Sequence, residues 1–170
     1  MIACKLWIVA ARRSSQGFEE VDGRVEAVRN SSSARSALAT LVDATRDGRL
    51  DSLCERFEVR VMSAFGSATR PSPTEPNDLD VAVSFSRSLD APIVGDRIGL
   101  WTALVDLTGY EPIDIVVLDV DDPVLRAEAL TGVPLYESIR GEFAEAQIAA
   151  VGERRDTAHL RRRNLELMAQ

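Results

Sequence analysis

Residues 65–85, FGSATRPSPTEPNDLDVAVSF, carry two short motifs on either side of a proline-rich loop. Gly66-Ser67 directly follows one apolar run. After ten further residues, Asp78-Leu79-Asp80 begins a second apolar run. Side chains alternate faces along a strand, so Asp78 and Asp80 are predicted to share a face, about 7 Å apart. Two carboxylates held in this way repel each other, and a hard cation such as Mg²⁺ relieves the repulsion. The spacing therefore predicts a metal site.

The Gly-Ser pair indicates a phosphate site beside that metal. Glycine adopts backbone angles that are closed to other residues and lets a phosphate approach the main chain. The Ser67 hydroxyl and neighbouring N–H groups can donate hydrogen bonds to the phosphate. We therefore expect a nucleoside triphosphate to bind between the turn at Gly66 and the metal.

The order Gly-Ser, ten residues, Asp-x-Asp resembles the signature of the polymerase-β-type nucleotidyltransferases. It is most similar to the small minimal nucleotidyltransferase (MNT) proteins, which act as antitoxins paired with HEPN ribonucleases. Three further segments resemble that family: IDIVVLD at 113–119, GVPLYE at 132–137 and DTAHLRRRNLEL at 156–167. The resemblance covers roughly residues 50–168. Members of the family often carry Gly-Ser-Arg-Ala-Arg-Gly, whereas this chain has Ala68 and Pro71 in place of the first arginine and the last glycine.

The resemblance implies an α/β protein with the polymerase-β-like nucleotidyltransferase fold, a small mixed sheet covered by helices, with C-terminal helices. It implies transfer of AMP from ATP to a hydroxyl group, with two Mg²⁺ ions held by Asp78 and Asp80. Asp114 would bind the catalytic ion and help to deprotonate the acceptor. From the local sequence alone, Asp114 fits a solvent-facing strand end equally well, and only the resemblance favours a metal ligand.

The same resemblance assigns nucleotide binding to Gly66, Ser67 and Arg70. It also implies a partner, a HEPN-type ribonuclease toxin, with one of its tyrosines as the acceptor, so that this chain would act as an antitoxin. Two other hypotheses stay open. One is an antitoxin that neutralises its partner by binding alone, which the residues at Ala68 and Pro71 favour. The other is an antibiotic-type small-molecule nucleotidyltransferase, which would need a substrate domain larger than the C-terminal helices.

Composition narrows the class of protein further. The chain has 170 residues, of which 45% are hydrophobic and 28% charged, as in ordinary globular domains. We expect an N-terminal extension at 1–30 and one nucleotidyltransferase domain at 31–170.

A net charge of -7 argues against extensive nucleic-acid binding, which depends on Lys and Arg. The apolar run at 6–11 is short and is followed by two arginines, so we expect a cytoplasmic protein that neither spans a membrane nor carries a signal peptide. Assembly as a homodimer or hetero-oligomer is left open.

Periodicity, capping residues and turn residues predict the secondary structure. Helices are expected at 34–46, 50–56, 93–108 and 123–130, and strands at 59–65, at 113–120 and from Asp78 onward. A turn is expected at 86–92 and a short extended segment at 134–136. Residues 138–169 are expected to be helical with a break near Gly152 and a second helix capped by Asp156.

Several single residues are expected to have structural roles. The two cysteines, Cys4 and Cys54, are predicted to be buried as small hydrophobic residues, Trp101 to lie in the core, and His159 on the surface. The acidic residues at 119, 121 and 122 are predicted to cap a helix and to be solvated. The arginines at 161–163 are predicted to form a solvated helix face or to contact an acidic partner or a phosphate.

Overall fold

The computed structural model describes residues 33–86, 93–119 and 122–168. Four of the predictions concern residues outside these ranges. They are the expected N-terminal extension, Cys4, most of the turn expected at 86–92, and Asp121. Within them, no helix has the length and the apolarity that a bilayer-spanning segment needs.

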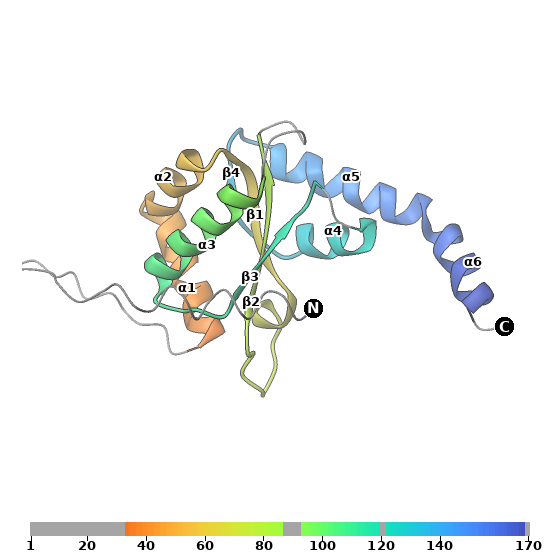
Figure 1. Cartoon of the computed structure of the whole chain (residues 1–170), viewed down its shortest axis with the longest axis horizontal. Helices are drawn as coiled ribbons and strands as arrows, with labels where there is room; N and C mark the ends of the chain where they lie inside the picture. The colour runs from red at the N-terminus through yellow and green to blue at the C-terminus, as the bar shows by residue number, and fades with distance from the viewer. Residues whose placement is uncertain (1–32, 87–92, 120–121, 169–170) are drawn as a thin grey trace, which may run out of the picture.

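A four-stranded mixed sheet forms the centre of the molecule (Figure 1). Its strands lie in the order β3-β2-β1-β4; β1 is antiparallel to both of its neighbours, and β2 and β3 are parallel. The strands are β1 (Val59–Phe65), β2 (Leu79–Phe85), β3 (Ile113–Val117) and β4 (Val133–Glu137). The antiparallel pairing of β1 with β2 places the C-terminal end of β1 next to the N-terminal ends of β2 and β3.

Helices cover both faces of the sheet (Figure 1). On one face lie α1 (Ala34–Arg46), α2 (Arg49–Arg56) and α3 (Ile93–Thr108), and on the other lie α4 (Pro123–Leu130) and α5 (Glu142–Asp156). The last helix, α6 (Ala158–Met168), continues from the end of α5 and extends away from the sheet. This arrangement confirms the predicted α/β class with a small mixed sheet covered by helices.

Two apolar clusters, one on each face, hold the sheet between the helices. The larger cluster joins Leu41, Cys54, Val81 and Leu104 from α1, α2, β2 and α3. The smaller joins residues of β1, β2, α4 and α5, among them Phe65. Because side chains alternate along β2, Leu79, Val81 and Val83 face the first cluster, and Asp80 and Ala82 face α4. The prediction that Cys54 is buried is confirmed.

Local sequence signals set several boundaries correctly. The observed α1, α3, α4 and β1 have the predicted bounds. Helix α1 begins after Ser33, whose side chain accepts a hydrogen bond from the Ser36 N–H. Helix α4 begins after Asp122, whose carboxylate accepts from the Val124 N–H at 2.7 Å, with Pro123 at the first helical position. The cap predicted at Asp122 is therefore confirmed.

The predicted break near Gly152 is wrong. Helix α5 runs through Gly152 to Asp156, and the chain leaves the helix at Thr157. Asp156 is thus the last residue of α5, and α6 begins only at Ala158. A single glycine costs about 1 kcal/mol in a helix, which is too little to interrupt a run of backbone hydrogen bonds.

The strand predicted at 113–120 is shorter than expected, and Asp119 is not simply solvated. Strand β3 ends at Val117. The Asp119 carboxylate accepts hydrogen bonds from the Ser84 hydroxyl at 2.9 Å and from the Phe85 N–H at 3.2 Å. These bonds turn the chain back onto the end of β2, so Asp119 has a structural partner that its sequence neighbours did not reveal.

The face of helix α3 that packs against the core differs slightly from the face that its sequence predicts. Trp101 packs against the core and donates its indole N–H to the Ile113 carbonyl at 3.0 Å, as a core residue should. Leu100 and Leu104 are fully buried, whereas Ile98 is 57% exposed. The helical spacing of Ile98, Trp101, Leu104 and Val105 predicts that they share one packed face, and for Ile98 this prediction is wrong. His159 is exposed, as predicted.

Candidate nucleotide and metal site

The Gly-Ser motif forms a tight turn where β1 ends. Residues Gly66–Thr69 make a single 3-10 turn, closed by the Thr69 hydroxyl donating to the Gly66 carbonyl at 3.0 Å. Gly66 has a φ of +72°, which side chains other than hydrogen strongly disfavour. A Cβ on Gly66 would also overlap the Asp80 carboxylate. The motif therefore requires glycine for two reasons, its backbone conformation and the carboxylate that lies against it.

Strand register brings two of the predicted carboxylates together. Asp80 in β2 lies directly opposite Asp114 in β3, and opposite Phe65 in β1. Adjacent strands are about 4.8 Å apart and paired residues point to the same face. Asp80 and Asp114 therefore both project toward the α4 face. Asp78 lies just before β2 begins and is half-buried, whereas Asp114 is exposed.

The charges at this edge of the sheet are not balanced. The pKa of Asp80 is raised above its ordinary value, first by burial and then by the negative charges of Asp78, Asp114 and Glu128. Carboxylate oxygens are the ligands that hard divalent cations such as Mg²⁺ prefer, so the residue types present fit such a cation. Within the described residues, however, no group of three or more acidic, His or Cys side chains is arranged so that it could hold a metal ion. The backbone gathers the three aspartates, and their side chains do not form a closed ligand set.

Ser67 and Arg70 differ in what they offer to a nucleotide. Ser67 is exposed at the turn, where its hydroxyl can reach a ligand. Arg70 is also exposed, but its guanidinium forms an ion pair with Glu128 of α4. Ala68, in the position where the family often carries arginine, is only 5% exposed and packs into the core. The turn therefore presents one arginine, and that arginine already has an acidic partner.

Arg35 of α1 holds the loop between the two motifs. The sequence alone did not predict this role of Arg35. Its Nη2 donates to the Ser72 carbonyl at 3.0 Å and to the Thr74 carbonyl at 3.2 Å. Its Nη1 forms an ion pair with Glu75 at 3.4 Å. Charge-assisted bonds to several acceptors of one loop restrict that loop more than a single contact would. These partners lie 37 to 40 residues away in the sequence, and no local pattern marks them.

The segment that leads into β2 is fixed at two further points. The Tyr110 hydroxyl donates to the Asn77 carbonyl at 2.8 Å, and the Leu79 N–H donates to the Pro112 carbonyl at 2.9 Å. Burial and the nearby charges of Asp78 and Glu75 raise the pKa of Tyr110, so its hydroxyl keeps the proton it donates. These bonds position the backbone on either side of Asp78.

Gly132, within the GVPLYE segment, packs against the end of β1. A Cβ there would overlap the Ala64 carbonyl and crowd the Phe65 side chain. The sequence marked this glycine only through its resemblance to the family. The structure adds a physical reason, since α4 can approach the strand that carries the Gly-Ser turn only if Gly132 has no side chain.

Replacing Arg35 with glutamine should weaken binding of a nucleotide at this site by about five- to tenfold. The loop would lose its charge-assisted bonds, and its ordering would then oppose binding. Isothermal titration with Mg²⁺-ATP measures the effect. Arg46→Gln is the matched control, because Arg46 belongs to the same helix and, among the residues that the structure describes, pairs only with the exposed Asp43. Equal losses in the two variants would contradict the role given to Arg35.

Comparison with known proteins places the chain in a family. Residues 49–140, more than half of the chain, match the family described as polymerase beta, nucleotidyltransferase. The chain therefore belongs to the polymerase-β nucleotidyltransferase family, and the domain is a nucleotidyltransferase domain, as its motifs predicted. No curated protein matches the sequence.

Solved structures support the same fold. A chain of the complex between tri-AMPylated Shewanella oneidensis HEPN toxin and an MNT antitoxin is 15% identical, with a TM-score of 0.56 over 79% of this chain and 99% of that one. A chain of a toxin–antitoxin complex with AMP-PNP is 16% identical, with a TM-score of 0.57 over 73% of this chain and 98% of that one. A chain of the MntA–HepT toxin–antitoxin complex is also 16% identical, with a TM-score of 0.54 over 73% and 97%. At these identities the likeness establishes the fold alone.

Proposed function

We propose that this protein is an antitoxin that transfers AMP from ATP to a tyrosine hydroxyl of a HEPN ribonuclease toxin in the cytoplasm, with release of pyrophosphate. The observation that carries the proposal is the packing of Gly66 against the Asp80 carboxylate, with Asp114 opposite Asp80 in register. This arrangement places a turn suited to phosphate beside a crowded set of carboxylates. The complexes of similar folds, one with AMP-PNP and one with an AMPylated toxin, support an adenine nucleotide as the donor and a toxin protein as the acceptor.

Each part of the site has a role in this proposal. Asp78, Asp80 and Asp114 would hold Mg²⁺, which when bound stabilises the attacking and leaving oxygens of an in-line phosphoryl displacement. The Gly66 backbone and the Ser67 hydroxyl would bind the triphosphate, and Arg70 would do so after leaving Glu128. Asp114, the most exposed of the three carboxylates, would accept the proton of the acceptor hydroxyl.

The test is calorimetry with Mg²⁺-ATP. We expect binding that requires Mg²⁺ and is lost in the Asp78→Ala, Asp80→Ala double variant. Removing two of three negative charges takes away the cation site without touching the core. The same ATP affinity in wild type and double variant would refute the assigned ligands.

A binding-only antitoxin is the second candidate, and two observations favour it. Ala68 is buried where the family often carries arginine, and Arg70 is paired with Glu128. A weak or absent triphosphate site would leave neutralisation to contact alone. Tight complex formation with an unmodified partner would decide for this second function.

The surface proposed for docking lies on α5 and α6, away from the carboxylates. Its exposed apolar side chains are Ile148, Val151, Leu160, Leu167 and Met168. Arg162 and Arg163 are exposed on α6 beside this apolar set. The combination favours a partner with an acidic rim around an apolar patch.

Reversing Arg162 and Arg163 to glutamate should weaken the complex by at least about tenfold and make it less sensitive to salt. Attraction between opposite charges speeds association and is screened by ions, so losing it removes both effects. The control carries the same charge change on the opposite face of the sheet, in Arg56→Glu, Arg97→Glu. Biolayer interferometry at two salt concentrations measures both complexes. If the two double variants behave alike, α6 is not the docking surface.

A further inference from the structure

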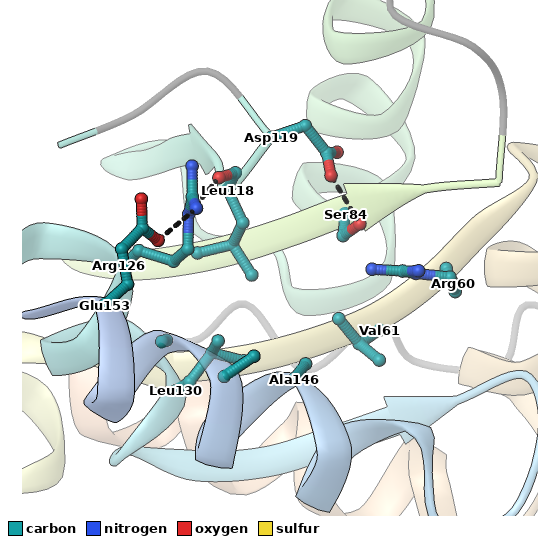
Figure 2. Close-up of a pocket in the computed structure, with 11 residues that line it drawn as sticks. Arg60, Val61, Ser84, Leu118, Asp119, Arg126, Leu130, Ala146 and Glu153 are labelled. Carbon is teal, nitrogen blue, oxygen red and sulfur yellow. Dashed lines mark hydrogen bonds and ion pairs between the residues drawn. The ribbon is translucent and has the colours of Figure 1, made fainter. Parts of the chain in front are cut away.

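A polar pocket of about 260 Å³, separate from the candidate nucleotide site, lies on the same face of the sheet as the carboxylates but at the other end of the strands. It is bounded by the sheet and by α4 and α5 (Figure 2). Arg60 is the second residue of β1, and Gly66 follows the last. At about 3.3 Å per residue, the pocket lies about 20 Å from the candidate nucleotide site.

A β-bulge places Arg60 at this pocket. The pairing of β1 with β2 runs from Val59 opposite Phe85 to Val61 opposite Ser84, so Arg60 is an extra residue without a partner on β2. A bulge of this kind re-aims the side chain of the extra residue. Figure 2 shows the Arg60 guanidinium reaching into the pocket from the side opposite Arg126.

Arg60 differs from the other polar side chains of the lining. Arg126 donates to the Leu118 carbonyl and to Glu153, both at 2.7 Å. Asp119 accepts from the Ser84 hydroxyl. The Nε of Arg60 is buried and, among the described residues, has no hydrogen-bond partner. A buried donor without a partner is costly, and a shift of the guanidinium toward the acceptor oxygen of a ligand in the pocket would remove that cost.

The chemistry of the pocket selects the charge of that ligand. A planar guanidinium binds a carboxylate through two parallel hydrogen bonds. One negative charge neutralises Arg60. A dianion such as phosphate would bring a second negative charge close to Asp119 and Glu153, which repel it. The pocket therefore favours a monoanion.

The remaining lining selects the body of the ligand. It consists of hydrocarbon side chains from β1, from the turn after β3 and from both helices, namely Val61, Leu118, Leu130, Ala146, Ala149 and Ala150. Such a wall favours an apolar group beside the carboxylate. The volume is just below the 300–1,000 Å³ of sites for drug-sized ligands, so the ligand must be small.

We propose that this pocket binds a small organic monocarboxylate, with its carboxylate on Arg60 and its apolar body between the sheet, α4 and α5. The site is separate from the nucleotide site and does not depend on the activity proposed there. Arg60 gives it charge specificity, and the alanines of α5 leave room for the body of the ligand.

The experiment uses 4-fluorobenzoate as the probe, with the purified full chain and detection by ¹⁹F NMR. We expect saturable binding to the wild type and at least about tenfold weaker binding to Arg60→Gln. Because Arg60 forms no ion pair with any residue that the structure describes, this substitution should not lower the thermal unfolding midpoint. Arg97→Gln, which removes an exposed arginine on α3, should bind as the wild type does. Neutral 4-fluorobenzamide, of nearly the same shape, should bind much more weakly.

A second variant tests the position of the site without changing its charge. Ala149 is exposed and lines the pocket, so Ala149→Phe should close the mouth while sparing the core, and binding should again be lost. Four results would overturn the proposal: no saturable binding to the wild type, equal affinity in Arg60→Gln, equal affinity for the benzamide, or unchanged binding to Ala149→Phe. Tighter binding of inorganic phosphate than of the carboxylate, measured by competition, would also overturn it.

Discussion

Co-expression with the Asp80→Asn variant should leave the partner toxin unmodified while the complex still forms. Asparagine keeps the size of the side chain but removes the charge that Mg²⁺ needs. Asp80 lies between the Gly66 turn and Asp114, and no other carboxylate among the described residues occupies that position. We expect AMP transfer to fall by at least about a hundredfold, as when other electrostatic groups are removed from an active site. Intact-mass spectrometry of the partner reads this directly as mass increments of one or more AMP.

Loss of folding would not explain that result. The Asp80 carboxylate is partly buried and is repelled by Asp78, Asp114 and Glu128, which raises its pKa. Removing its charge removes this repulsion, so the unfolding midpoint of the metal-free variant should not decrease. The docking surface proposed on α5 and α6 is unchanged, and affinity for the partner should stay within a few-fold. A partner that still gains AMP in the presence of Asp80→Asn would exclude Asp80 from the chemistry.

Gly66→Ala should abolish measurable Mg²⁺-ATP binding. A non-glycine residue in the left-handed region costs roughly 1–2 kcal/mol, and here the new methyl group also overlaps Asp80. The carboxylate must then move or the turn must open. Displacements of about 1 Å at a reacting centre can lower rates a hundredfold. Calorimetry with ATP and intact-mass spectrometry of the partner should both report the loss.

Gly48→Ala separates the two causes. Gly48 has a φ of +80°, close to that of Gly66, but a Cβ there would meet nothing within 4 Å. This variant should lose roughly 1–2 kcal/mol of unfolding free energy and keep its ATP affinity. Equal losses of ATP affinity in the two variants would mean that general destabilisation, and not the contact with Asp80, disables the site.

Local sequence determined the elements of this fold and the residue types of its site. Helix α1 follows from a serine cap and an apolar stripe, and α4 from Asp122-Pro123. The spacing of Gly66-Ser67 and Asp78-Leu79-Asp80 indicated the family, which the comparison confirms. These signals act through side chains within about four residues of each other, so they can be read without knowing the packing. The same reasoning misplaced the break in the C-terminal helices, because the cost of one glycine is small compared with the cooperativity of a helix.

Only the tertiary structure decided which distant residues meet. Asp80 faces Asp114 because of the parallel register of β2 and β3, and Glu128 adds its charge because α4 covers that face. Arg35 reaches a loop about 40 residues away, and the bulge in β1 turns Arg60 into the polar pocket. Register, bulges and helix placement depend on the burial of whole faces and not on any single segment. The sequence by itself therefore specified the chemistry available to this protein, and packing specified where that chemistry converges.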